Sequence, residues 1–345
     1  MSGPGTTVAH ARTIQRRDAL RLVAAAVATI APSRFARAQK SAPLRIGYWA
    51  TGIQLALIEL IQSRKIFEKY GLAYELVRFA DVNGNTLALA TDQIDVAFSV
   101  SGAGALDLAS RKRPIRIVLL TQTADGQLVT KAPEIKTAAD LRGKVIGMAP
   151  TGSAGAALTK AFLSRNFGLE QGAYRPVGGG EARLLQLLAQ GEVAAALLRE
   201  VSWVQYQKRI GLRSLADQRV EWKRIAGTDA VPPLGLGVVQ EKILANRRTD
   251  AVAFVAAIMD GIKSGAADHG AVADLMARTL RLDADEAKAY ADTWSISFHG
   301  RFEDSDVASL ELAQRLFVEE KTLTAVADRE FFDQTIYRDA VARLT

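Results

Sequence analysis

The stretch Gly143–Leu169, GKVIGMAPTGSAGAALTKAFLSRNFGL, decides the fold because its order of features occurs twice in the chain. The segment Leu44–Leu72, LRIGYWATGIQLALIELIQSRKIFEKYGL, also has an apolar strand ending in Ile-Gly, a polar turn, a helix of about four turns and a closing Gly-Leu. The parallel continues, since LATDQIDVAF (89–98) aligns without gaps with LAQGEVAAAL (188–197). This repeat predicts two α/β lobes of similar topology.

Two polar, turn-rich segments lie where the chain would pass between these lobes. One is TQTADG (121–126), and the other is GTDAVPPLGLGVV (227–239), where two prolines precede an apolar strand. We therefore expect two mostly parallel sheets flanked by helices, with a ligand cleft between them. The expected boundaries are 39–124 plus 230–345 for the first lobe and 125–229 for the second, with hinges near 121–127 and 227–234.

The turn GMAPTGSAG (147–155) resembles a phosphate loop but lacks its lysine. In a Walker A loop the second glycine is followed by Lys and Ser/Thr, whereas here Gly152 is followed by Ser153 and Ala154. A strand, a tight turn and the free N–H groups of a helix start remain, which form a generic receptor for an anion or dipole. The turn therefore favours binding of an anionic or polar group over phosphoryl transfer. The alternative is that its Gly and Ser residues are needed only for the geometry of the turn.

The first 38 residues have the three regions of an export signal in the right order. A basic stretch containing Arg16-Arg17 precedes an apolar run at 22–31, and Ala36-Arg37-Ala38 predicts cleavage after Ala38. Ten apolar residues are too few to span a bilayer. The paired arginines are similar to a twin-arginine signal, although Ala19 stands where Phe is usual. We expect a periplasmic protein, with twin-arginine or Sec export left open and an amphipathic helix as the alternative.

Composition and missing motifs exclude several classes of function. Without residues 1–38, which hold six Arg and one Asp, the formal net charge falls from +7 to about +2, so a nucleic-acid partner is not expected. The chain has no cysteine, and its three histidines (His10, His269 and His299) form no zinc-binding spacing. No G-x-S-x-G nucleophile elbow occurs either. We predict a protein that is not an enzyme, with no cofactor and no metal.

These features resemble the nitrate/sulfonate/taurine-type (NMT1/SsuA-like) solute-binding proteins of ABC importers. The motifs that carry the resemblance follow one another along the chain: LRIGY, GL-x-YELVRF, QIDVAFS, ADLRGKVIGMAPTGSAGAA and LLAQGEVAAALL. The resemblance implies the type II periplasmic binding-protein fold. It also implies a monomer that captures a small organic anion, sulfonate-like, taurine-like or an aromatic acid, by cleft closure and presents it to a membrane permease with its ATPase.

The resemblance further implies ligand-binding positions at the strand ends. Structural roles are the alternatives there, because Trp49 could cover the sheet end, and Ser99 and Ser101 could cap a helix. Arg199 could pair with Glu200 or with a neighbouring helix on the surface. The chain lacks the cluster of basic residues at strand ends that a small desolvated anion would need. The expected positions are Trp49, Ala50, Thr51, Ser99, Ser101, Gln122, Thr123, Thr151, Gly152, Ser153, Ala154, Arg199 and Glu200.

Two other functions are compatible with these patterns. Enzymes related to thiamine-pyrimidine synthases are similar at the level of the domain, but they carry a cysteine- and histidine-based iron motif that a chain without cysteine does not match. A sensor or partner-presenting protein of the same fold would share the capture chemistry. Genomic adjacency to a permease and an ATPase would discriminate import from sensing.

Overall fold

The computed structural model describes residues 1–3, 5 and 42–344. All the helices and strands named here lie in one compact unit, Ala42–Thr345. The paired arginines, the apolar run and the cleavage site of the expected export signal lie outside the described residues. None of the described helices has the length and apolar character needed to cross a membrane.

Six strands form the first sheet, in the order β11-β4-β10-β3-β1-β2. Strand β1 pairs in parallel with β2 and β3, and β10 runs antiparallel between β3 and β4. Strand β3 is buried along its whole length, as expected for an apolar strand covered on both faces. The strands are β1 (Leu44–Trp49), β2 (Tyr74–Phe79), β3 (Val96–Ser101), β4 (Ile115–Thr123), β10 (Pro233–Gln240) and β11 (Phe298–Arg301).

Five strands form the second sheet, in the order β7-β6-β8-β5-β9. Strand β6 pairs in parallel with β7 and β8, and β5 runs antiparallel between β8 and β9. The order matches that of β2-β1-β3-β10-β4, so the predicted repeat of topology is confirmed. The strands are β5 (Gly126–Thr130), β6 (Val145–Met148), β7 (Arg175–Gly178), β8 (Ala195–Arg199) and β9 (Arg213–Asp217).

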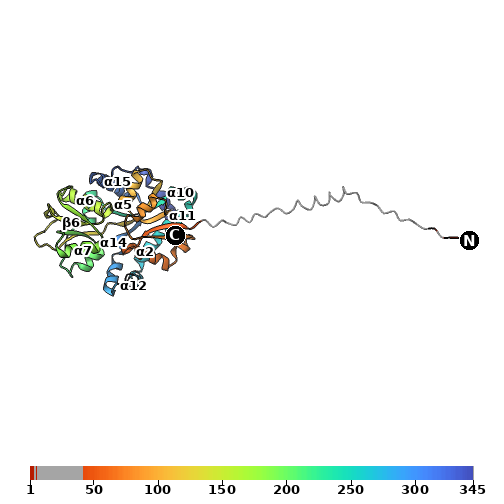
Figure 1. The fold of residues 1–345 in the computed structure, drawn as a ribbon, viewed down its shortest axis with the longest axis horizontal. Helices are drawn as coiled ribbons and strands as arrows, with labels where there is room; N and C mark the ends of the chain where they lie inside the picture. The colour runs from red at the N-terminus through yellow and green to blue at the C-terminus, as the bar shows by residue number, and fades with distance from the viewer. Residues whose placement is uncertain (4, 6–41, 345) are drawn as a thin grey trace. The chain divides into compact units, whose positions relative to one another are not determined.

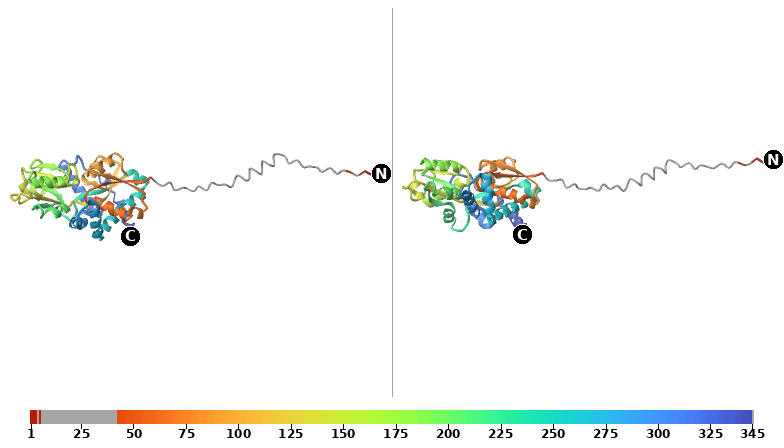
Figure 2. Two further views of the ribbon diagram at one scale, coloured as in Figure 1. Left: turned by 60° about the horizontal axis from the view of Figure 1, so that its bottom comes forward. Right: turned by 90° about the horizontal axis from the view of Figure 1, so that it is seen from below.

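Helices flank both sheets (Figure 1), and Figure 2 shows the same layers from two further sides. Around the first sheet lie α2 (Gly52–Ser63), α3 (Ile66–Lys69), α4 (Gly84–Ala90), α5 (Gly102–Ser110), α10 (Glu241–Asn246), α11 (Arg248–Ala267), α12 (His269–Leu280), α13 (Ala284–Asp292), α14 (Trp294–Ser297), α15 (Asp304–Glu319) and α16 (Gln334–Val341). Around the second lie α6 (Ala154–Phe167), α7 (Glu181–Gln190), α8 (Glu200–Tyr206) and α9 (Gln218–Ala226). Short 3₁₀ turns occur at Ala138–Leu141 and Arg329–Phe331.

The two copies of the repeat differ in their helices. In the second copy α6 is continuous and ends at Gly168, which has φ +64° as a left-handed C-cap requires. In the first copy, the expectation of one helix of about four turns is wrong. The chain leaves the helix after Ser63, because Lys65 adopts a left-handed conformation with φ +51°, and it resumes as the short α3.

Helices α6 and α9 of the second sheet also pack into the core of the first. The indole Nε1 of Trp222, on α9, donates to Ser309 Oγ on α15 at 3.1 Å. The apolar contact of α6 and α9 with the core of the first sheet, called the seam here, joins the two halves along one side. We propose the lobe boundaries and hinges given above on this basis, with α6 and α9 as the pivot. The residues of α6 and α9 in the first core are Ala154, Ala157, Leu158, Ala161 and Trp222.

Candidate functional site

The carboxyl ends of strands in the two sheets meet at the start of helices. Strand β3 leads into α5 through Ser101, and β6 leads into α6 through the turn 149–153. Ser101 Oγ accepts the backbone N–H of Ala154 at 2.9 Å, which joins the two helix N-termini. A Cβ atom at Gly102 would lie 3.5 Å from Ala154 Cβ and 3.1 Å from the carbonyl oxygen of Pro233. Strand ends of the two sheets therefore meet here, and in this conformation the two helix starts are in contact at that point.

The turn before α6 uses part of its hydrogen-bonding capacity internally. Ser153 caps the helix, with its Oγ accepting the N–H of Ala156 at 3.4 Å, and the N–H of Ala154 is taken by Ser101. Gly152 has φ +80°, a left-handed conformation that favours glycine, and Thr151 is exposed. A ligand that binds here has to replace Ser101 Oγ or use other groups of the turn.

The ends of β1 and β3 are tied together by Ser99. Its Oγ accepts the backbone N–H of Trp49 and the Nδ2 of Asn85, each at 3.2 Å. The indole Nε1 of Trp49 donates to the carbonyl oxygen of Ala80 at 3.1 Å, and Ala50 is buried. Ser99 therefore has a structural partner on each side. Thr51, the exposed N-cap residue of α2, makes no side-chain capping hydrogen bond among the described residues.

The end of β4 supplies two further predicted positions. Gln122 is buried and its Oε1 accepts Gln54 Nε2 at 2.6 Å. Thr123 Oγ1 donates to the carbonyl oxygen of Ile296 at 2.7 Å, which attaches β4 to α14. Both side chains lie at the edge of the first sheet where the chain crosses to the second. Gln54 was not among the predicted positions.

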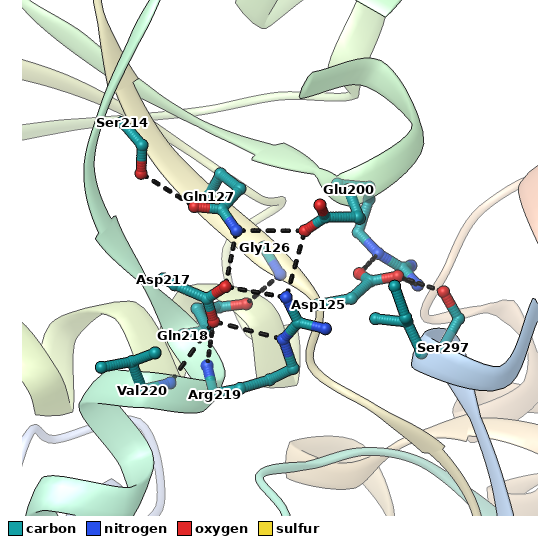
Figure 3. Close-up of polar contacts among 12 residues, drawn as sticks. Asp125, Gly126, Gln127, Glu200, Ser214, Asp217, Gln218, Arg219, Val220 and Ser297 are labelled. Atoms are coloured by element: carbon teal, nitrogen blue, oxygen red, sulfur yellow. Dashed lines mark hydrogen bonds and ion pairs between the residues drawn. The ribbon is translucent and has the colours of Figure 1, made fainter. Parts of the chain in front are cut away.

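Arg199 is neutralised by a buried carboxylate. Its Nε and Nη2 both donate to Asp125, with 2.9 Å from Nη2 to Oδ2. Ser297 on α14 donates to the same oxygen (Figure 3). Asp125 lies between β4 and β5 with 2% of its side chain exposed, and Arg199 retains 22%. The three residues join the crossover, the second sheet and a helix of the first. The open alternative that Arg199 pairs with Glu200 is not what the structure shows.

Glu200 belongs to a neighbouring polar cluster at the ends of β5, β8 and β9. Its Oε2 accepts Gln127 Nε2 at 3.0 Å and Arg219 Nη2 at 3.3 Å (Figure 3). Asp217 Oδ2 accepts hydrogen bonds from the same two groups, at 2.6 Å from Gln127 Nε2 and 2.8 Å from Arg219 Nη2. Burial opposes ionisation of Asp217, but its hydrogen bonds and the charge of Arg219 outweigh it and lower the pKa of this carboxyl. The cluster holds its charges by mutual pairing.

Glu181, at the start of α7, is a fourth carboxylate at these strand ends, after Asp125, Glu200 and Asp217. Its Oε1 accepts the backbone N–H of Arg199 at 2.6 Å. Burial raises the pKa of Glu181, and the nearby charge of Asp125 acts in the same direction. Burial, helped by the charge of Glu181, also raises the pKa of Tyr290 to about 12. Arg199 has two carboxyl groups beside it, those of Asp125 and Glu181. Among these described residues, its positive charge is therefore compensated.

Sequence reasoning did not find the residues that the predicted positions contact. Asp125 stands in the crossover TQTADG, which marks it as a residue at the junction, but nothing in the sequence pairs it with a residue 74 positions away. Likewise, nothing in the sequence indicated that Ser297, 172 positions from Asp125, contacts it. Among the described residues, no group of three or more His, Asp or Glu side chains is arranged to hold a metal ion. Two surface hollows, of about 600 and 410 Å³, lie elsewhere, one at the amino ends of β6 and β8 and one beside the seam.

A comparison with protein families matches residues 67–269, more than half of the 345-residue chain, to a model described as NMT1/THI5 like. The chain belongs to the NMT1/THI5-like family. No curated protein matches the sequence. This membership confirms the family resemblance drawn from the motifs.

Solved structures share the fold at low sequence identity. The periplasmic aliphatic sulphonate-binding protein SsuA from Escherichia coli is 18% identical, with a TM-score of 0.68 over 84% of this chain and 91% of that one. The alkanesulfonate-binding protein SsuA from Xanthomonas axonopodis pv. citri, bound to MOPS, is 15% identical, with a TM-score of 0.69 over 85% and 98%. The desulfurization enzyme DszB is 14% identical, with a TM-score of 0.60 over 88% and 100%. The fold is that of type II periplasmic binding proteins, as predicted.

Proposed function

We propose that this protein is the periplasmic substrate-binding component of an ABC importer and acts as an exported monomer. The observation that carries the proposal is the meeting of α5 and α6 at Ser101 and Ala154, where strand ends of both sheets converge. In open α/β sheets, ligands bind beyond the carboxyl ends of the strands. Membership of the NMT1/THI5-like family and the fold shared with sulfonate-binding proteins support this role.

The solute is a small organic acid held largely by neutral donors. Arg199 has its charge compensated by Asp125, so it does not offer a free cation. Helix N-termini supply N–H groups and a favourable dipole to an acidic group without a counter-charge. We propose Thr51, at the start of α2, and the turn Thr151–Ala154 as contacts, with Trp49, Ala50, Ser99, Ser101, Gln122, Thr123, Arg199 and Glu200 around them.

Opening and closing of the cleft follow from the contacts between the lobes. The hydrogen bond from Ala154 to Ser101 is a single neutral contact, worth about 1 kcal/mol. The rest of the seam, formed by Ala157, Leu158, Ala161 and Trp222, is apolar and more extensive, so it stays in place while the lobes rotate about it. The closed form is then presented to a membrane permease, and the partner ATPase hydrolyses ATP.

An enzymatic function is the second candidate, since DszB has the same fold. Fold alone does not carry an activity. The chain has no cysteine, so neither a thiol nucleophile nor a thiolate-bound iron is available. A sensor without a transport role would bind its solute in the same way. Only its partner proteins would distinguish it from an importer component.

The test is a thermal-shift screen of the chain from residue 39 against sulfonates, taurine, nitrate, bicarbonate, aromatic acids and pyrimidines. A ligand at about 1,000 times its dissociation constant stabilises the fold by about 4 kcal/mol, which raises Tm by several degrees. Thr51→Val should weaken binding of a hit, whereas Thr91→Val, at the far end of α4, should not. Absence of any hit from a folded, ligand-free preparation would refute the solute class, and equal binding by both variants would remove α2 from the site.

A further inference from the structure

Two buried amide side chains face each other across the ends of the first sheet. Gln54 lies in the first turn of α2 and Gln122 near the end of β4, with 3% and 2% of each residue exposed. Gln54 Nε2 donates to Gln122 Oε1 at 2.6 Å. Strands β3 and β10 lie between β1, which precedes α2, and β4. The amide pair, Gln54 and Gln122, therefore spans the strand ends that line the proposed cleft.

The pair leaves two buried polar atoms unsatisfied. Within the described part of the chain, Gln54 Oε1 and Gln122 Nε2 have no hydrogen-bond partner. Turning both amides over gives the same result, because one N–H group and one oxygen still remain. An unpaired buried polar group costs about 1–3 kcal/mol, so two apolar side chains of the same size would suit the unliganded fold better. The unpaired N–H group and the unpaired oxygen of this pair are free to bind water or a solute.

The unsatisfied oxygen is directed at the start of α2. A Cβ atom at Gly52, the first residue of this 12-residue helix, would lie 3.6 Å from Gln54 Oε1. The helix begins with N–H groups that have no intrahelical partner, and the hydroxyl of its N-cap residue Thr51 does not cap them. The N–H groups of the helix start thus lie near Gln54 Oε1, and Gln122, whose Nε2 is unpaired, is hydrogen-bonded to the same Gln54 side chain.

We propose that the amide pair and the start of α2 form a subsite for a carboxamide-type edge, a carbonyl oxygen beside an N–H group. Amides, ureides and lactams carry this edge. The carbonyl accepts from Gln122 Nε2 and the N–H groups of α2, and the ligand N–H donates to Gln54 Oε1. This inference rests on the proposed function, which supplies the lobe opening that gives access to the pair, and an acidic group can occupy another part of the same solute.

A simple anion does not satisfy this subsite. Sulfonate, nitrate and carboxylate groups offer only acceptors, so they would leave Gln54 Oε1 buried against a negatively charged oxygen. A site built to hydrogen-bond a particular group discriminates strongly against an analogue that lacks it. The amide pair therefore sets specificity for the solute rather than general affinity for anions.

The experiment uses the full-length chain and matched ligand pairs in calorimetry: nicotinamide with nicotinate, succinamate with succinate, and uracil with 1,3-dimethyluracil. We expect the member with the amide-type edge to bind at least about 10-fold more tightly in at least one pair, since one lost buried hydrogen bond has this effect. If organic acids bind and no amide member binds more tightly, the subsite is refuted while the proposed function stands. If neither member of any pair binds, the subsite is refuted, and the wider solute screen decides the proposed function separately.

Variants separate recognition from a structural role. Gln54→Met and Gln122→Met should each abolish the preference for the amide member, whereas Gln62→Met, on the exposed face of the same helix, should keep it. The double variant Gln54→Met/Gln122→Met should unfold at a Tm equal to or above that of the wild type. A lower Tm together with an unchanged ligand preference would show that the pair only holds α2 to β4, and would overturn the proposal.

Discussion

Removing the carboxylate of Asp125 tests whether the junction between the sheets depends on a buried ion pair. Asp125 accepts two hydrogen bonds from Arg199 and one from Ser297, and only 2% of its side chain is exposed. Asp125→Asn keeps the shape but leaves the guanidinium of Arg199 without its counter-charge. Breaking a buried pair from one side costs about 3–5 kcal/mol. Because Arg199 keeps 22% exposure, we expect the lower end, about 3 kcal/mol.

The assay is urea unfolding at neutral pH, followed by circular dichroism and tryptophan fluorescence. The midpoint should fall while the slope stays constant, since a changed slope would report a change in the exposed surface rather than in stability. Asp229→Asn is the matched control, because the same substitution there breaks only an exposed pair with Lys223 and should leave the midpoint unchanged.

A double-mutant cycle isolates the pair itself. Arg199→Met alone leaves Asp125 as a buried, unpaired charge, whereas Asp125→Asn/Arg199→Met removes both charges together. The double variant should therefore lose clearly less stability than the sum of the two single variants. Additive losses, or an Asp125→Asn midpoint equal to that of Asp229→Asn, would refute the reasoning, because Arg199 would then be hydrated rather than held by Asp125.

Two further predictions concern the second sheet. Gly152→Ala should destabilise the fold by about 1 kcal/mol in thermal unfolding, because Gly152 has φ +80° and not because of crowding, as no atom lies within 4 Å of its Cβ position. Gly270→Ala, in the first turn of α12 and outside the left-handed region, meets only an ordinary contact of 3.7 Å to Asp268 Oδ1 and should cost nothing, and equal losses would argue against the backbone as the cause. Burial raises the pKa of Glu181 above its ordinary 4.5, so the folded state keeps the proton longer and wild-type stability falls as pH rises past that value. The stability of the wild type relative to Glu181→Gln should thus fall as the pH rises above about 4.5 in urea unfolding, and a constant difference would contradict the shift.

The sequence by itself determined the family, the two sheets and their shared topology. These depend on local signals, namely apolar strands ending in Ile-Gly, helix starts and terminal glycines, repeated in the same order in Leu44–Leu72 and Gly143–Leu169. Such signals lie within single strand-turn-helix units, so they can be recognised without knowing which residues the unit contacts in the fold. The break of the first helix at Lys65 was missed because nothing in the sequence indicates that this lysine adopts a left-handed backbone conformation.

Only the tertiary structure decided which side chains meet at the strand ends. Gln54 pairs with a residue 68 positions away, Asp125 with residues 74 and 172 positions away, and Ser101 with a backbone N–H 53 positions away. Charge and hydrogen-bonding capacity can be read from a residue type, but pairing depends on distances of a few ångströms set by the packing of whole sheets. For this reason Arg199 was a plausible anion receptor in the sequence, and it is a neutralised residue in the fold.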